Sequence, residues 1–244
     1  MNAIVLCEGE TDKIILECVF SSKFGYKNDK EETKKNGGEA FFYKNSKHKL
    51  CINPVDGHDF RIKFNEILIN NERNTDTFYD CIIIIADHDS EKETSRLKDE
   101  IKSTMEQNNI KLNDELKCNK WIEVNQNIEF NESKKIELIF IPLPLDAEGA
   151  LETFLMKCLR KQNEYLVDES NKFVKCLIEN HDKFSNEYLE KRRDKVKAPL
   201  AVYLGVTIPE KSFLKEKEMF KEVPWENYID VSDGLEKLKK LSDD

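Results

Sequence analysis

Two aspartates that follow a run of isoleucines form the strongest candidate site for chemistry in this sequence. The run at 82–85 predicts a strand that is buried on both faces, and Asp87 and Asp89 come directly after it. Ligands of open α/β sheets bind where the strands end, and a divalent cation relieves the repulsion between neighbouring carboxylates. We therefore expect these two aspartates to bind a metal ion. The alternative is that Asp89 and Ser90 only cap the helix beginning near Glu91.

A second acidic group follows the first predicted strand, at residues 3–7. Glu8 leaves this strand, Gly9 permits a tight turn or the close approach of a ligand, and Asp12 opens the next helix. From there Asp12 can point back toward the same edge of the sheet. The alternative is an ordinary strand, turn and helix cap with no binding role.

A third acidic group lies at the start of a helix expected over 148–160. Glu148 and Glu152 are four residues apart, which places them on one face of such a helix. The alternative is that these acids only complement the helix dipole, as acidic first turns commonly do. Three acidic groups at one edge of one sheet would repel each other unless cations bind between them, so their coincidence favours a metal site.

Strands and helices alternate along the first two thirds of the chain. This alternation predicts an α/β fold, Rossmann-like, with a mostly parallel sheet, right-handed crossovers and flanking helices. The expected strands are 3–7, 50–55, 80–86, a segment near 121–124, and 136–141, and the expected helices begin near 12, 59, 91 and 148. The polar segment 25–48 is expected to be a loop or insertion, and Asp56-Gly57 a turn.

The remainder of the chain is more charged and has helical periodicity. Apolar residues recur at helical spacing over 170–190, 210–220 and 235–241, and the apolar stretch 198–204 is expected to pack on the core. We therefore divide the chain into a catalytic core over 1–156 and a helical C-terminal extension over 157–244.

Composition restricts the kinds of partner. The 244 residues are 39% apolar and 36% charged, with a net charge of −9, which disfavours broad, nonspecific adhesion to nucleic acid. A nuclease remains compatible with this charge, because a local basic cluster could bind phosphates: Lys191, Arg192, Arg193, Lys195 and Lys197. The alternative for this cluster is a solvated helix face.

The sequence also indicates a cytoplasmic protein. Its apolar runs are shorter than a membrane span, and its start has no basic region and reaches a charge at Glu8, so we expect neither a membrane segment nor a signal peptide. Its seven cysteines are scattered without a Cys-x-x-Cys pair, so we expect small buried side chains in a reducing compartment and no zinc site.

The order of these motifs resembles a known family. The chain holds an apolar strand with Glu8-Gly9, an acid at Asp12, a glycine-containing turn at Asp56-Gly57, and an apolar strand with Asp87-x-Asp89. Over about residues 1–156 this resembles the Toprim domain of type IA topoisomerases, bacterial primases, ribosomal-RNA maturation nucleases, recombination mediators and the overcoming-lysogenization-defect (OLD) nucleases. The Glu-Gly-x-x-Asp opening is most similar to the nuclease branch. The stretch 148–152 is similar to small stand-alone Toprim-like proteins of unassigned activity.

The resemblance implies roles for the acids. Glu8 would bind metal or act as general acid or base, Asp87 and Asp89 would hold Mg²⁺ or Mn²⁺, and Asp12 with Glu152 would complete a second site. Two such cations about 3.5–4 Å apart can clamp the attacking and leaving oxygens of a phosphodiester. Oxygen ligands suit these ions rather than zinc.

Residues around the acids also receive roles from the resemblance. Nuclease relatives add a lysine near the metals that stabilises the charged transition state, and here Lys195 or Lys197 is the candidate. Glu148 is a further candidate metal ligand. His88 is expected to point away from the two neighbouring aspartates, and therefore to flank the site rather than bind metal.

The function implied is Mg²⁺-dependent cleavage of phosphodiester bonds in DNA or RNA, with a role as the effector of a defence system by analogy. The sequence has no evident tyrosine-nucleophile, zinc-binding or polymerase domain and no Walker A motif, so any controlling ATPase must be a separate partner. The oligomeric state is open, with a homo-oligomer among the options.

Two other functions stay open. One is a non-catalytic module that binds nucleic acid or protein, as in recombination mediators. The other is a phosphatase or phosphotransferase of the haloacid-dehalogenase type, in which Asp-x-Asp supplies a nucleophile and an acid. That motif normally follows the first strand and continues with Gly-Thr, whereas here it follows the third predicted strand and continues with Ser-Glu.

Overall fold

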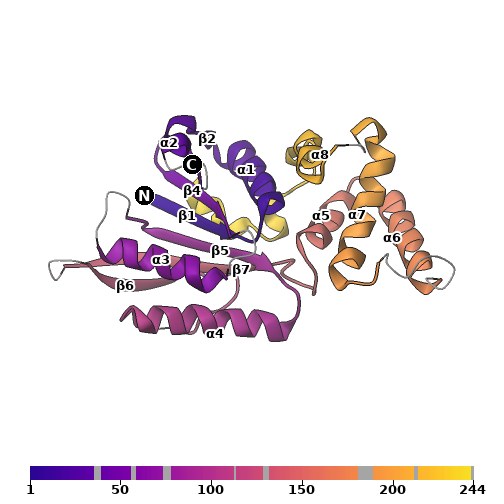
Figure 1. Ribbon diagram of the computed structural model, residues 1–244. Coiled ribbons are helices and arrows are strands. Elements are labelled where there is room, and N and C mark those ends of the chain that lie inside the picture. Colours follow the sequence, from indigo (N-terminus) through magenta and orange to yellow (C-terminus); the bar gives the residue numbers. More distant parts are fainter. Residues whose placement is uncertain are drawn as a thin grey trace.

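The computed structural model contains a seven-stranded sheet with helices on both faces (Figure 1). It describes residues 1–35, 40–55, 59–73, 78–112, 114–128, 132–180, 189–211 and 214–242, with the backbone alone for residues 193, 216 and 217. The strands are β1 (Asn2–Cys7), β2 (Lys27–Asn28), β3 (Phe41–Lys44), β4 (Lys49–Pro54), β5 (Cys81–Asp87), β6 (Ile122–Ile128) and β7 (Glu132–Leu143). Their order across the sheet is β2-β3-β4-β1-β5-β7-β6.

The centre of the sheet is parallel and its margins are antiparallel. Strands β4, β1, β5 and β7 run in one direction, whereas β3, β2 and β6 oppose their neighbours. The α/β fold with a mostly parallel sheet, predicted from the strand–helix alternation, is therefore confirmed. Because β1 and β5 are adjacent and parallel, the residues that follow them emerge at the same edge of the sheet.

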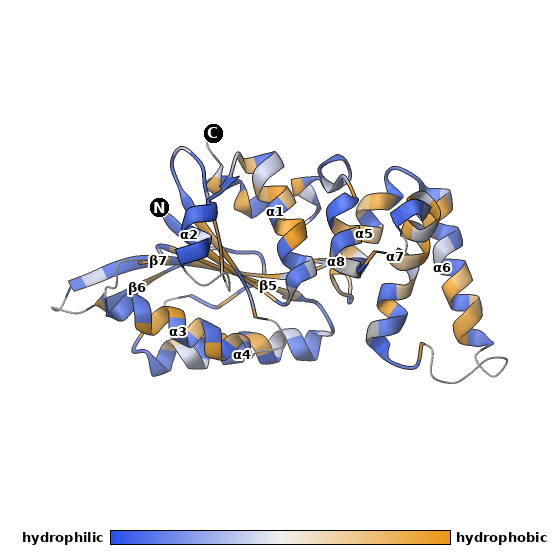
Figure 2. Ribbon diagram, turned by 45° about the horizontal axis from the view of Figure 1, so that its top comes forward, coloured by the Kyte–Doolittle hydropathy of each residue, from blue (hydrophilic) through white to orange (hydrophobic). Residues whose placement is uncertain are grey.

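The two faces of the central strands bury different side chains. Val5 and Ile83 pack with α1 (Glu10–Phe24) and α5 (Leu151–Arg160), while Leu6 and Ile84 pack with α3 (Phe60–Glu72) and α4 (Glu91–Gln107). Burial on both faces explains why these strands are continuous apolar runs, and Figure 2 shows hydrophobic residues concentrated in them. Among the described cysteines all are free, and Cys7, Cys51, Cys81 and Cys158 are buried.

The segment predicted as a loop at 25–48 contains regular structure, so that prediction is wrong. Besides β2 and β3 it holds the short helix α2 (Lys30–Lys35). Strand β3 pairs with β4, and Tyr43 is almost fully buried. Polar neighbours dominate the composition of this segment, but its three consecutive aromatic residues, at 41–43, suit a half-buried strand. The turn expected at Asp56-Gly57 lies outside the described residues.

The C-terminal part is helical and returns to the sheet. Its described residues include α6 (Glu164–Glu179), α7 (Arg192–Thr207), α8 (Glu216–Glu222) and 3₁₀ segments at Pro209–Lys211, Trp225–Asn227, Val231–Asp233 and Glu236–Leu241. Helices α6 and α7 lie beside α5, whereas α8 lies against α1 (Figure 1). The helix expected at 235–241 is thus a 3₁₀ segment. The helix expected over 170–190 begins earlier, at Glu164, and ends at Glu179. The apolar stretch 198–204 lies within α7.

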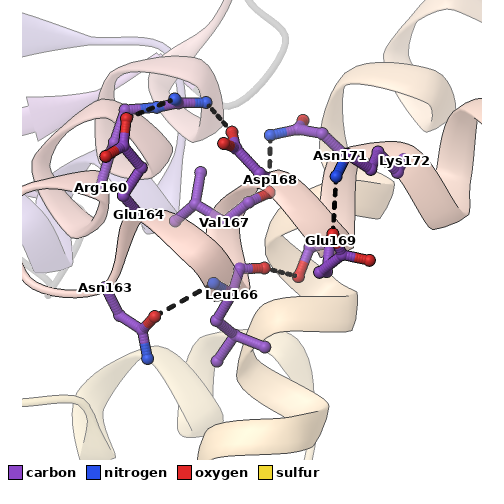
Figure 3. Close-up of polar contacts among 10 residues, drawn as sticks. Arg160, Asn163, Glu164, Leu166, Val167, Asp168, Glu169, Asn171 and Lys172 are labelled. Atoms are coloured by element: carbon purple, nitrogen blue, oxygen red, sulfur yellow. Dashed lines mark hydrogen bonds and ion pairs between the residues drawn. The ribbon is translucent and has the colours of Figure 1, made fainter.

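The connection between α5 and α6 is fixed by polar contacts (Figure 3). The Asn163 side chain accepts a hydrogen bond from the Leu166 N–H at 3.0 Å and caps α6. The guanidinium of Arg160 donates to Asp168 at 2.5 Å and to Glu164 at 3.5 Å. These contacts hold the two helices in one hairpin. No helix in the described ranges is long and apolar enough to cross a bilayer.

Candidate metal-binding site

Four acidic side chains from four elements converge at the carboxyl edge of the parallel strands. Glu8 follows β1, Asp12 lies in the first turn of α1, Asp87 ends β5, and Glu152 lies in the first turn of α5. Burial and the charge of Glu8 are the largest causes that raise the pKa of Asp87, and Asp12 and Glu152 contribute too. The structure therefore brings these four predicted residues together. We refer to Glu8, Asp12, Asp87 and Glu152 as the acidic centre.

Backbone groups fix the orientation of the acidic centre. The Asp87 N–H donates to Oε1 of Glu8 at 2.8 Å, and the Leu151 N–H donates to Oδ1 of Asp87 at 2.9 Å. Oδ2 of Asp12 accepts a hydrogen bond from the Gly9 N–H at 3.1 Å. A backbone N–H therefore holds each of these carboxylates, and a carboxylate has further lone pairs that can bind a cation.

The electrostatics of the acidic centre favour a cation. Burial, followed by the charge of Glu8, raises the pKa of Asp12 to about 7, and the same two causes raise the pKa of Asp87 to about 9. Backbone hydrogen bonds lower both pKa values but do not offset the burial and repulsion. A divalent cation among these carboxylates would reverse that balance.

Asp89 lies at the rim, apart from the acidic centre. Its side chain is 47% exposed and forms an ion pair with Arg192, whose Nη2 also donates to the Asp89 carbonyl oxygen at 2.7 Å. Ser90, not Asp89, caps α4, because its side chain accepts a hydrogen bond from the Glu93 N–H. The alternative that Asp89 is only a helix cap is therefore wrong.

Glu148 is also at the rim, and the prediction that it shares a helix face with Glu152 is wrong. Helix α5 begins at Leu151, so Glu148 lies in the preceding loop and is exposed. The charge of Glu148 contributes to raising the pKa of Arg192. The backbone at Ala150 is extended, which delays the helix and separates the two glutamates.

Helix α7 supplies the cations that face the acids. Lys197 pairs with Glu152, with Nζ 2.9 Å from Oε1, and Arg192 pairs with Asp89 as described above. Lys195 is exposed and does not line the cleft described below, so the structure favours Lys197 over Lys195 as the basic residue at the site. Arg192 was noted in the sequence only as a member of a basic cluster, and its contact with Asp89, 103 residues away, had no local signal.

Two hollows meet at the acids. The larger, of about 800 Å³, lies between the sheet edge and α7, and the smaller, of about 320 Å³, lies toward α4. Glu8, Asp87 and Asp89 line both hollows. The larger one is also lined by Asp12, Glu152, Arg192 and Lys197. The acidic centre is thus accessible from a cleft that carries both acids and bases.

The donor set fits a hydrated hard cation. Within the described ranges, no three His, Cys, Asp or Glu side chains are arranged to hold a metal ion directly. Mg²⁺ usually keeps several waters and binds through one or two carboxylates, so it does not require a closed cage of protein ligands. The carboxylates of Glu8 and Asp87, which both line the two hollows, are such a pair, and oxygen donors favour Mg²⁺ or Mn²⁺ over softer ions.

Comparison with known proteins places the chain in a family and supports its fold. Residues 2–229 match the family described as "Protein of unknown function (DUF3226)", and the chain belongs to that family. Among solved structures it is similar to the hypothetical protein PH0156 from Pyrococcus horikoshii OT3. That similarity has a TM-score of 0.53 at 12% sequence identity, and it covers 98% of this chain and 93% of the other. It supports the fold alone. No curated protein matches the sequence.

Proposed function

We propose that this protein is a Toprim-type nuclease that uses Mg²⁺ or Mn²⁺ to cleave phosphodiester bonds in DNA or RNA. The convergence of Glu8, Asp12, Asp87 and Glu152 is the observation that carries the proposal. Buried carboxylates that repel one another are costly, and a divalent cation would offset that cost. The roles in a defence system and with a separate ATPase depend on the Toprim resemblance alone, and the cytoplasmic location depends on the composition of the sequence.

Each element contributes a different group to the proposed reaction. Glu8 and Asp87 would hold the cation through their carboxylates, and Asp12 and Glu152 would supply further negative charge around it. A bound cation would polarise a phosphoryl oxygen and lower the pKa of a bound water. Lys197 is placed to stabilise negative charge at the reacting phosphate, because it already faces Glu152 in the same cleft.

Helix α7 is the proposed contact for the nucleic-acid backbone. Its first residues include exposed Lys191, Arg192 and Lys195, beside a cleft whose other wall is acidic. This arrangement lets the phosphates bind on the α7 side while the acids hold the cation. The net charge of −9 then limits nonspecific binding elsewhere on the surface.

A nuclease assay with matched variants tests the proposal. Plasmid, single-stranded DNA and total RNA are incubated with the protein in Mg²⁺, Mn²⁺ or EDTA. Asp87→Asn is compared with Asp114→Asn, an exposed aspartate outside both hollows. We expect metal-dependent cleavage by the unsubstituted protein and an unchanged rate of cleavage by Asp114→Asn. The rate should fall by at least about 100-fold in Asp87→Asn. That loss exceeds the loss expected from removing a group which only orients a metal ligand. Equal cleavage by all three proteins would indicate contamination and contradict the proposal.

A non-catalytic binding module is the second candidate. It is favoured by the ion pairs Lys197–Glu152 and Arg192–Asp89, which neutralise two acids without a metal. In that case the acids would attach α7 to the core. Nucleic-acid binding without cleavage under any metal condition would support this function. Hydrolysis of a phosphomonoester with a trapped aspartyl-phosphate would instead support the phosphatase alternative.

A further inference from the structure

His88 lies between the two aspartates but faces the opposite side of the strand. Its side chain is buried, with 6% of the residue exposed, and Nδ1 lies 3.0 Å from the carbonyl oxygen of Pro144. A carbonyl oxygen only accepts, so Nδ1 must carry the proton and donate. In the neutral ring Nε2 is then an acceptor. It has no hydrogen bond among the described residues, and Oε1 of Glu91 lies 3.4 Å from it.

The backbone of His88 makes two more bonds to the same loop. Its N–H donates to the Leu143 carbonyl oxygen at 2.8 Å, and its carbonyl oxygen accepts from the Gly149 N–H at 2.8 Å. His88 therefore holds the segment 143–149 at three points. This segment connects β7 to α5 and determines where α5 begins.

The loop is packed tightly where it reaches α5. A Cβ added at Gly149 would lie 2.6 Å from Oγ1 of Thr153, closer than side-chain atoms approach in real structures. Glycine is therefore needed for the close approach of this loop to the first turn of the helix. A displacement of the loop would consequently move the N-terminus of α5.

The N-terminus of α5 carries Glu152 and the backbone donor that orients Asp87. The Leu151 N–H is the donor to Asp87, and the next residue is Glu152. A shift of this helix end would separate Glu152 from Asp87 and break the hydrogen bond that orients the Asp87 carboxylate. Side chains that orient metal ligands typically change metal affinity by about 10- to 100-fold when they are removed.

We infer that His88 is a positioning residue, which fixes the 143–149 loop on the end of β5 and so holds the α5 N-terminus and Glu152 beside Asp87. This inference rests on the proposed metal-dependent function. It assigns no contact between His88 and metal or substrate. It predicts that the hydrogen bond to Pro144, not the size of the ring alone, sets the geometry of the acidic centre.

The test compares variants that keep or remove the donor. In His88→Asn an amide N–H can replace Nδ1–H, whereas His88→Leu has no donor. Gln126→Leu is the matched control, because Gln126 is 1% exposed and donates to the Leu68 carbonyl oxygen on the α3 side, away from the acidic centre. Mn²⁺ binding is measured by calorimetry, and folding by circular dichroism and thermal unfolding in EDTA.

We expect the Mn²⁺ dissociation constant of His88→Leu to rise at least about 10-fold, while His88→Asn and Gln126→Leu stay within about 3-fold of the unsubstituted protein. Equal binding by His88→Leu, or equal weakening in Gln126→Leu, overturns the inference and leaves the proposed function standing. No Mn²⁺ binding by the unsubstituted protein overturns the proposed function itself. If His88→Leu does not fold, His88→Gln takes its place. Its amide nitrogen matches the position of Nε2 and not that of Nδ1, so this variant also lacks the donor to Pro144.

Discussion

Asp12 and Asp87 carry the main electrostatic cost of the site. Both are partly buried, and in the described part of the chain neither is paired with a lysine or arginine. Neighbouring carboxylates raise both pKa values further, so the ionised form of each side chain is less stable in the folded protein than in water. Such a cost without compensation is typical of sites that bind something positive.

Replacing Asp87 by asparagine should therefore have opposite effects on metal-free stability and on metal binding. Asparagine keeps the acceptor for the Leu151 N–H but removes a carboxyl whose raised pKa makes folding costly above about pH 4. We expect the Tm in EDTA to rise by a few degrees, since about 1 kcal/mol corresponds to about 2–4 °C for a chain of this size. Mn²⁺ should raise the Tm of the unsubstituted protein and leave that of the variant unchanged. A lower Tm for the variant in EDTA would contradict this account.

The same carboxylates predict how metal-free stability depends on pH. In the folded protein the pKa is about 7 for Asp12 and about 9 for Asp87, against 3.8 for an ordinary aspartate. The folded state therefore binds more protons than the unfolded state between these pH values. The contribution of these two carboxyls to the free energy of unfolding is consequently greatest below about pH 4 and is lost as the pH rises to about 9. Unfolding in EDTA between pH 5 and 9 should show a falling Tm. The Asp12→Asn/Asp87→Asn variant should reduce this slope, and an unchanged slope would argue against the assignment.

At the scale of elements, α7 determines the charge of the cleft. Glu152 is buried, with a side chain only 7% exposed, and its partner Lys197 comes from α7. Asp89 and Arg192 form a similar pair, but both are about half exposed. Breaking an ion pair with a buried member costs more stability than breaking an exposed pair, because it leaves an unpaired charge in the interior.

Alanine substitutions on α7 should separate these two pairs. Lys197→Ala should destabilise the protein by about 3 kcal/mol, whereas Arg192→Ala should cost less than about 1 kcal/mol. Both should weaken nucleic-acid binding and reduce its salt dependence, because each removes a cation from the cleft. Urea unfolding and binding titrations at two salt concentrations measure these effects. Lys195→Ala, an exposed neighbour outside the cleft lining, is the control for stability alone, and a loss of stability as large as that of Lys197→Ala would contradict the assignment.

Local patterns predicted the parallel elements well and the peripheral ones poorly. The isoleucine run at 82–85 predicts β5 because a strand buried on both faces must be apolar throughout. The strand β3 was missed because it is short and polar on either side. The start of α5 was placed too early because an acidic first turn is also the pattern of a real helix N-terminus, and the loop contacts that delay it come from His88.

For the whole molecule, the C-terminal residues complete the core instead of forming a separate unit. Leu235, Leu238 and Leu241 are almost fully buried in the same cluster as strands β1 and β5. The Trp121 indole N–H donates to the carbonyl oxygen of Lys237 at 2.9 Å, which joins β6 to the chain end. No sequence pattern within 235–241 reveals this, because a helical period of leucines does not indicate which surface covers them.

A chain that ends at residue 230 should therefore be strongly destabilised. It loses the burial of three leucines, each worth about 1.5–3 kcal/mol, which is comparable to the whole stability of a typical domain. We expect loss of cooperative unfolding by circular dichroism. Leu238→Ala in the full chain should cost about 2–5 kcal/mol, and an exposed leucine, Leu214→Ala, should cost little. A truncated chain that unfolds cooperatively near the Tm of the full chain would contradict this role.

The central claim is that Glu8 and Asp87 bind one divalent cation within the acidic centre. Anomalous diffraction from a crystal soaked in Mn²⁺ measures it most directly. We predict a Mn²⁺ peak at bonding distance from the carboxylates of Glu8 and Asp87, with waters completing its coordination. A crystal with no Mn²⁺ at this edge of the sheet, or with Mn²⁺ bound elsewhere while these carboxylates stay unligated, would contradict the claim.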